Sequence, residues 1–127
     1  MAILKAIEHP SKQHGGMRNV IEYVLQDKKI PDGQVDLLGP GPVENLTWDN
    51  VYRAYMDVKK AWNKDGGRMY AHEVISFHQA EKITPEEALD FGKEFAAKTY
   101  PDHQVLLSVH QDREHLHVHM IINSVAY

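Results

Sequence analysis

The sequence predicts an α+β domain in which a mainly antiparallel sheet has helices packed on one face and a histidine site on the other. The expected order of elements is β-α-(β)-α-β-α-β-β, which favours an antiparallel sheet with packed helices over regular βαβ units. The last two strands follow each other through a short polar turn, as in a hairpin. A chain of 127 residues with 43% hydrophobic content supports one core, so residues 1–127 are expected to form a single domain.

The first half of the chain begins with an expected strand at Ala2 to Ile7, which Gly15-Gly16 separates from a helical pattern. The apolar stripe of this helix comprises Met17, Val20, Ile21, Val24 and Leu25, and Lys28, Lys29 and Pro31 close the segment. The many prolines and glycines between 30 and 44 indicate a loop that contains a short strand at Val35 to Leu38.

A second helix is expected after Thr47, whose hydroxyl is placed to cap it. Its inward stripe is expected to consist of Trp48, Val51, Tyr55, Val58 and Trp62, before Asp65-Gly66-Gly67 ends it. Because the aromatic residues of this helix belong to a core stripe, we expect them to be structural.

The second half of the chain begins with residues 70–77, which alternate as a strand does. ITPEEAL then signals a helix, because Thr84 caps it, Pro85 takes the first helical position and Glu87 completes a capping box. Its buried side is expected to be Ala88, Phe91, Gly92, Phe95 and Ala96. Two strands follow at about 103–109 and 115–125, joined by the turn 111–114.

Histidines concentrate at the end of the chain, where HQDREHLHVH holds four of the nine in ten residues. In an extended strand, one face would carry His115, His117 and His119, and the other Leu116, Val118, Met120 and Ile122. Imidazoles two apart on a strand, with a third from the adjoining strand, can hold one metal ion. His110, His117 and His119 fit that arrangement best. Histidines on an exposed strand are often inert, but four at this spacing favour a site.

Neighbouring residues extend this polar face. His72 and Ser76 share a face of the preceding strand. Asp112 is equally compatible with orienting an imidazole and with forming the turn, whereas Glu114 is expected only to form the turn.

Composition excludes several classes of protein. Without cysteine, the chain has neither disulfides nor thiolate ligands. No apolar run approaches membrane-spanning length and no signal sequence is apparent, so we expect a cytoplasmic protein without a membrane segment. The formal net charge of −4 argues against binding nucleic acid through bulk charge alone, but it leaves room for a local basic groove.

The motif HQDREHLHVHMIINSV resembles the third motif of relaxases, the mobilisation nucleases of the HUH endonuclease superfamily. The resemblance implies a divalent metal on His110, His117 and His119, with Mg²⁺ or Mn²⁺ expected first and Zn²⁺, Ni²⁺ or Co²⁺ as other choices. Asp112 and the following Asn123 are expected in a second shell around it. The segment MYAHEVISFHQAEKITPEEAL is similar to the second motif, which implies that Ser76 lies near DNA; His72 and Arg68 are expected to contact DNA as well.

The N-terminal helix resembles the first relaxase motif, which implies that Tyr23 is the nucleophile. Helical geometry independently leaves Tyr23 on the flank of the apolar stripe, away from its centre, which suits a reactive residue. The resemblance implies that the chain is a DNA endonuclease that nicks single-stranded origin-of-transfer DNA and forms a 5′-phosphotyrosyl intermediate, with His115 as candidate base. Accessory relaxosome proteins are further expected partners. The chain is expected to be an N-terminal portion of a longer protein.

Two alternatives remain open from the residues alone. The string from His115 to Ile121 also resembles that of histidine-triad nucleotide hydrolases, in which His117 would be a metal-free nucleophile. The upstream His110 and Asp112 favour the relaxase. The other alternative is a DNA-binding or metal-binding remnant without catalysis.

Overall fold

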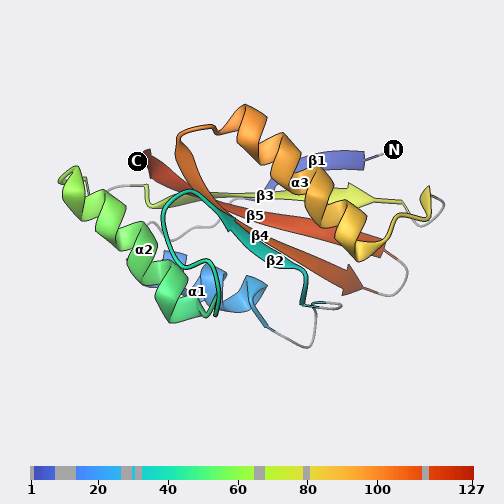
Figure 1. The fold of residues 1–127 in the computed structure, drawn as a ribbon, viewed down its shortest axis with the longest axis horizontal. Coiled ribbons are helices and arrows are strands. Elements are labelled where there is room, and N and C mark those ends of the chain that lie inside the picture. The colour runs from blue at the N-terminus through green and yellow to red at the C-terminus, as the bar shows by residue number, and fades with distance from the viewer. Residues whose placement is uncertain are drawn as a thin grey trace.

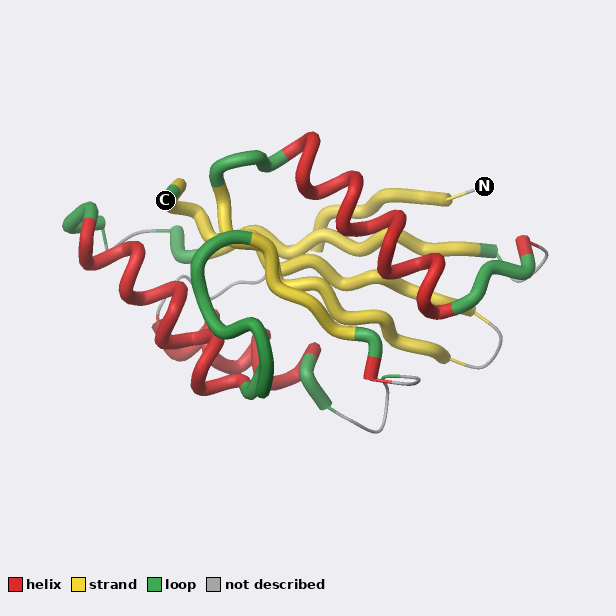
Figure 2. Tube along the Cα trace, viewed as in Figure 1, coloured by secondary structure: helices red, strands yellow, loops and turns green. Residues whose placement is uncertain are grey.

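The computed structural model describes residues 2–7, 14–26, 30, 33–64, 68–78, 81–112 and 115–127, with the backbone only at 14, 15 and 112. Its five strands form one sheet in the order β1-β3-β5-β4-β2, and every neighbouring pair is antiparallel (Figures 1 and 2). The strands are β1 (Ala2–Ile7), β2 (Val35–Leu38), β3 (Tyr70–Phe77), β4 (His103–Asp112) and β5 (His115–Ala126). The α+β class, the antiparallel sheet and the terminal hairpin are confirmed.

One face of the sheet is covered by α3 (Pro85–Thr99), which lies along the strands in Figure 1. Thr84 accepts a hydrogen bond from the Glu87 backbone N–H and the Glu87 side chain accepts one from the Thr84 backbone N–H, so the predicted capping box is confirmed. The expected inward side chains of β5 are buried beneath it: Leu116, Val118, Met120 and Ile122. A Cβ on Gly92 would lie 2.8 Å from Val118 Cγ1, so this glycine lets α3 approach β5 closely.

The opposite face is partly covered by α1 (His14–Val24) and α2 (Trp48–Ala61). The expectation that all helices pack on one face therefore needs correction, because two of the three lie on the face that carries the histidines. The reason is visible in β4 and β5, where Leu106 and Ile121 occupy that face and are fully buried under the two helices. An apolar stretch on this face needs a cover, and α1 and α2 provide it.

Two aromatic side chains lie outside the core in which the sequence predicted them. Trp62 follows the end of α2 and is 56% exposed, while Lys59 takes the buried position one turn earlier. Phe91 is 46% exposed and meets Phe77 edge to face, with ring centroids 5.5 Å apart. Met56 and Leu89 are buried in these helices instead.

The hairpin is tighter than predicted, because β4 continues through Gln111 and Asp112, which pair with Leu116 and His115. Several predicted segment ends lie outside the described residues, namely Lys28, Lys29, Pro31, residues 65–67 and Glu114. No helix in the described ranges is long and apolar enough to cross a membrane.

Candidate functional site

The histidine cluster is assembled from three adjacent strands. On β5, His117 pairs with His110 of β4 on one side and with Ser76 of β3 on the other. His119 lies one step along the same face, and its ring centroid is 4.3 Å from that of His110. Strand register therefore brings together the three histidines that the sequence singled out as metal ligands.

Each of these rings has a hydrogen-bond partner on one nitrogen. His119 Nδ1 lies 2.9 Å from His72 Nε2, and His117 Nδ1 lies 2.9 Å from Ser76 Oγ. His110 Nε2 lies 2.8 Å from the Val24 carbonyl oxygen. Because a carbonyl only accepts, His110 Nε2 carries a proton and donates it, which leaves the lone pair of the neutral ring on Nδ1.

The predicted nucleophile, Tyr23, lies in the last turn of α1 directly above this cluster. Its ring centroid is 5.9 Å from that of His110 and 6.2 Å from that of His119, and both contacts are edge-on. The Val24 carbonyl next to it also accepts a 2.6 Å hydrogen bond from Ser108 Oγ. Two bonds from β4 thus hold the end of α1, so Tyr23 stays over the sheet while its side chain remains 41% exposed.

A pocket of about 520 Å³ opens beside these residues. Its described lining is Lys5, Ala6, Ile7, Tyr23, Val74, Ser76, His110, Gln111, His117 and His119. The structure thus gathers the predicted nucleophile, the three predicted ligands and Ser76 around one cavity. Sequence reasoning missed Lys5, although its alternation with Ile3 and Ile7 on a first strand could have indicated a side chain on the same face.

The other predicted site residues lie around or away from this pocket. His72 is only 4% exposed and lies beside His119 on the same face of the sheet. His115 is exposed, with its ring centroid 6.4 Å from that of His117 and 6.1 Å from that of His78. The Asp112 backbone pairs with His115, and its side chain lies outside the described residues. Arg68 is exposed next to Ser124, toward the opposite end of β5.

Asn123 belongs to a buried network under α2 and contacts none of the three predicted ligands among the described hydrogen bonds. Its side-chain oxygen accepts from Lys59 Nζ at 2.5 Å, and its nitrogen donates to Gln104 Oε1 at 2.7 Å. Lys59 also donates to the Met69 carbonyl at 2.6 Å. Burial lowers the pKa of Lys59 to about 8. Lys59 was also missed from the sequence, although it lies four residues after Tyr55 on the buried stripe.

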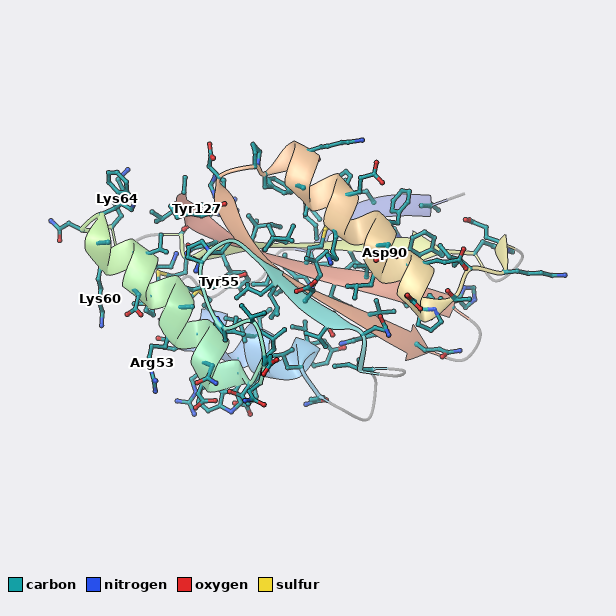
Figure 3. The ribbon with its side chains drawn as sticks, in the orientation of Figure 1. Arg53, Tyr55, Lys60, Lys64, Asp90 and Tyr127 are labelled. Atoms are coloured by element: carbon teal, nitrogen blue, oxygen red, sulfur yellow. The ribbon has the colours of Figure 1, made fainter. Side chains whose placement is uncertain are left out.

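Other polar groups of α2 divide between this network and solvent. The hydroxyl of Tyr55 donates to the Ile121 carbonyl and accepts from the Leu106 N–H, so it joins α2 to two strands. Burial raises the pKa of Tyr55 above the ordinary range of a phenol. The outer face of the same helix carries Arg53 and Lys60, which point away from the sheet (Figure 3).

The donor set of the histidine cluster fits a divalent ion in its chemistry and strand register. Imidazole is the common protein ligand for such metals, and the hydrogen bonds to His110, His117 and His119 are of the kind that orients metal-bound histidines. Within the described ranges, no three histidine, aspartate or glutamate side chains are already gathered tightly as a metal site.

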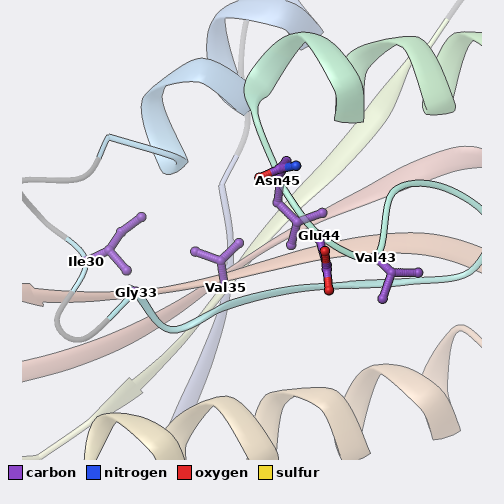
Figure 4. A pocket seen from close by; sticks show the side chains of 7 residues that line it. Ile30, Gly33, Val35, Val43, Glu44 and Asn45 are labelled. Carbon is purple, nitrogen blue, oxygen red and sulfur yellow. The ribbon is translucent and has the colours of Figure 1, made fainter.

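A second pocket, of about 420 Å³, lies beside β2 and contains none of the predicted site residues (Figure 4). Its described lining is Ile30, Gly33, Val35, Val43, Glu44, Asn45 and Leu46. Glu44 is the one titratable side chain among these described lining residues, which therefore include no acid–base pair and no cluster of ligands. The chemistry is concentrated in the histidine pocket.

A family model and a search of curated proteins both relate this chain to relaxases. Residues 23–127 match the family model described as "Relaxase: MobA/VirD2-like, nuclease domain". Three curated proteins of Staphylococcus aureus, each named Protein rlx, are 36%, 37% and 32% identical to this chain over 81 residues. Those residues are 64% of this chain and about a quarter of each relative. No solved structure gives a significant match.

Proposed function

Because this chain belongs to the family of MobA/VirD2-like relaxase nuclease domains, we propose that it nicks single-stranded origin-of-transfer DNA through attack by Tyr23. The observation that carries this proposal is the position of Tyr23, whose ring lies edge-on to both His110 and His119 beside one pocket. The proposed nucleophile, the proposed metal-binding histidines and open space for a phosphate therefore occur together.

In the proposed reaction the Tyr23 oxygen attacks the scissile phosphorus and the bond from phosphorus to the 3′ oxygen breaks. The phenol loses its proton, and the departing 3′ oxygen gains one. The products are a 5′-phosphotyrosyl strand and a free 3′-hydroxyl. Because one phosphoester bond replaces another, the same site can run the reaction in reverse and rejoin the strand.

A divalent ion on His110, His117 and His119, with Mg²⁺ or Mn²⁺ the first candidates, would polarise the non-bridging phosphate oxygens and stabilise the charge of the transition state. His72 and Ser76 orient the rings of His119 and His117 for that task. Since His72 is nearly buried, we propose that it acts mainly through His119 and that Ser76, which lines the pocket, lies nearer to the DNA.

His115 remains our candidate proton acceptor. Its exposed ring lies beside His117, whereas the rings next to Tyr23 are those of His110 and His119, so we expect water to relay the proton. In a His115→Ala variant, the rate of nicking should fall and its dependence on pH should change. An unchanged rate and pH profile would remove His115 from the mechanism.

The decisive experiment incubates the protein with labelled single-stranded origin DNA and Mg²⁺ or Mn²⁺, and detects the covalent protein–DNA adduct on a denaturing gel. We expect the adduct in the wild type, its loss in Tyr23→Phe and its persistence in the matched control Tyr52→Phe. An adduct that survives in Tyr23→Phe would show that the nucleophile is wrong. DNA binding without any adduct in the wild type would favour a non-catalytic role.

A chelator arm of the same assay separates the relaxase from the histidine-triad hydrolase. The relaxase should lose nicking when the divalent ion is removed, whereas a triad hydrolase would use His117 on a nucleoside phosphate without metal. The same proposal makes DNA the partner of this chain. It also implies accessory relaxosome proteins as further partners and a cytoplasmic location.

A further inference from the structure

β1 adds a row of side chains to the rim of the histidine pocket. Strand register places Ile3 opposite Ser76, Lys5 opposite Val74 and Ile7 opposite His72. These three residues of β1 consequently share the face that carries the histidines. Residues 2–7 precede the stretch that matches the relaxase family model, so that comparison assigns no role to them.

The register also puts Lys5 in line with the site. Val74 separates Lys5 from His119, since Val74 pairs with both residues across the sheet. Two strand spacings put the backbones of Lys5 and His119 about 10 Å apart. The flexible four-carbon stem of a lysine bridges much of that separation, and Lys5 does line the pocket together with His117 and His119.

Charge distinguishes Lys5 from the rest of the lining. Of the described residues around this pocket, Lys5 is the one lysine or arginine. It is exposed, and its side chain forms no ion pair or hydrogen bond with the described part of the chain. The whole chain carries a formal net charge of −4, so a polyanion approaching this pocket needs a local cation.

Exposed lysines on edge strands also protect a sheet from pairing with another chain. The neighbours of Lys5 argue for an additional role, because Ile3 is 54% exposed and Ile7 is 38% exposed on the same face. Along this exposed strand, a lysine lies between two isoleucines. Such an arrangement suits single-stranded DNA, which presents phosphates and unstacked bases together.

We propose that Lys5 binds a DNA phosphate adjacent to the scissile one and that Ile3 and Ile7 contact the flanking bases. This inference rests on the proposed function and adds a positioning residue from outside the matched family region. Lys5 places the strand across the pocket; it takes no part in bond making or proton transfer.

The test measures binding of fluorescent single-stranded origin DNA at several salt concentrations, in a Tyr23→Phe background that prevents covalent capture. Lys5→Gln should weaken binding several-fold at low salt and reduce the slope of log affinity against log salt by about 0.7, the value for one phosphate contact on a single strand. Lys5→Arg should retain the wild-type slope. Ile7→Ser should weaken binding while leaving the slope unchanged.

The matched control is Lys60→Gln, which removes an exposed lysine from the outer face of α2 (Figure 3). In nicking assays with Tyr23 intact, Lys5→Gln should raise KM with little change in kcat. If Lys5→Gln and Lys60→Gln give the same slope and KM while the Tyr23-dependent adduct still forms, this inference is wrong and the proposed function stands. An adduct that does not depend on Tyr23, or a wild type that binds no single-stranded DNA, would overturn the proposed function as well.

Discussion

The face of β5 that carries His117 and His119 has two ends that differ in their surroundings. Toward the start of the strand, His117 and His119 are partly exposed and line a pocket. Toward its end, Ile121 and Asn123 continue the same face but are completely buried beneath α1 and α2. The side chains on this face change from histidine to isoleucine at residue 121, and α1 and α2 cover the face from that apolar position onward.

This difference decides what a polar side chain can do. At the open end, each imidazole is held on one nitrogen by a neighbour, as for His117 by Ser76, and faces space where a ligand fits. At the closed end, formed by Ile121 and Asn123, the Asn123 side chain accepts a hydrogen bond from Lys59 and donates to Gln104 and to the Tyr55 carbonyl. The open end suits binding and catalysis, whereas the closed end suits joining α2 to the sheet.

The largest expected effect is at the open end. His119→Ala should reduce nicking by more than the 10–100-fold typical of losing an outer partner of a metal ligand, because we propose His119 as a ligand itself. The thermal midpoint should change little, since His119 is partly exposed at the rim of a pocket. Nicking rates and unfolding curves measured on the same preparations check both statements. Normal nicking and metal affinity in this variant would remove His119 from the ligand set.

The next largest effect is expected at the closed end, where a substitution should lower stability rather than act directly on nicking. Asn123→Ala removes the shorter of the two side-chain hydrogen bonds of the buried Lys59 and leaves only the one to Ser124 Oγ, and breaking such a buried polar pair costs about 3 kcal/mol in the free energy of unfolding. The free energy can be measured by urea denaturation, with Asn19→Ala on the exposed side of α1 as control. A variant as stable as this control, but defective in metal binding, would return Asn123 to the second shell that the sequence predicted.

The sequence predicted the strands, the capped helix and the histidine cluster well, because each depends on local patterns. Alternation alone places His117 and His119 on one face, and Thr84, Pro85 and Glu87 alone predict the start of α3. The placement of α1 and α2 depends on contacts distant in sequence, such as Tyr55 with Ile121, and no local pattern specifies those. For the same reason, the buried partners of Asn123 could not be predicted from the motif, and its place in a second shell stays a prediction.

The smallest expected effect is a dependence of stability on pH that originates at the closed end. The pKa of Lys59 is lowered by burial from 10.5 to about 8. Between these two values the unfolded chain binds more protons at this position than the folded chain, so the contribution of Lys59 to stability should rise with pH over that range. Below about pH 8 the cost of burying the charged ammonium is fully present.

Urea denaturation at several pH values between 8 and 10.5 measures this dependence. Lys59→Met, which matches the side chain as far as Cε and removes the titrating group, should flatten the curve. Lys60→Met, at the exposed neighbouring position, should leave its shape unchanged. If wild type and Lys59→Met show parallel curves, Lys59 keeps its proton in the folded protein throughout this range. In that case, hydrogen bonds to Asn123 and the Met69 carbonyl stabilise the charged ammonium enough to offset its burial. A charged Lys59 would then join α2 to the sheet.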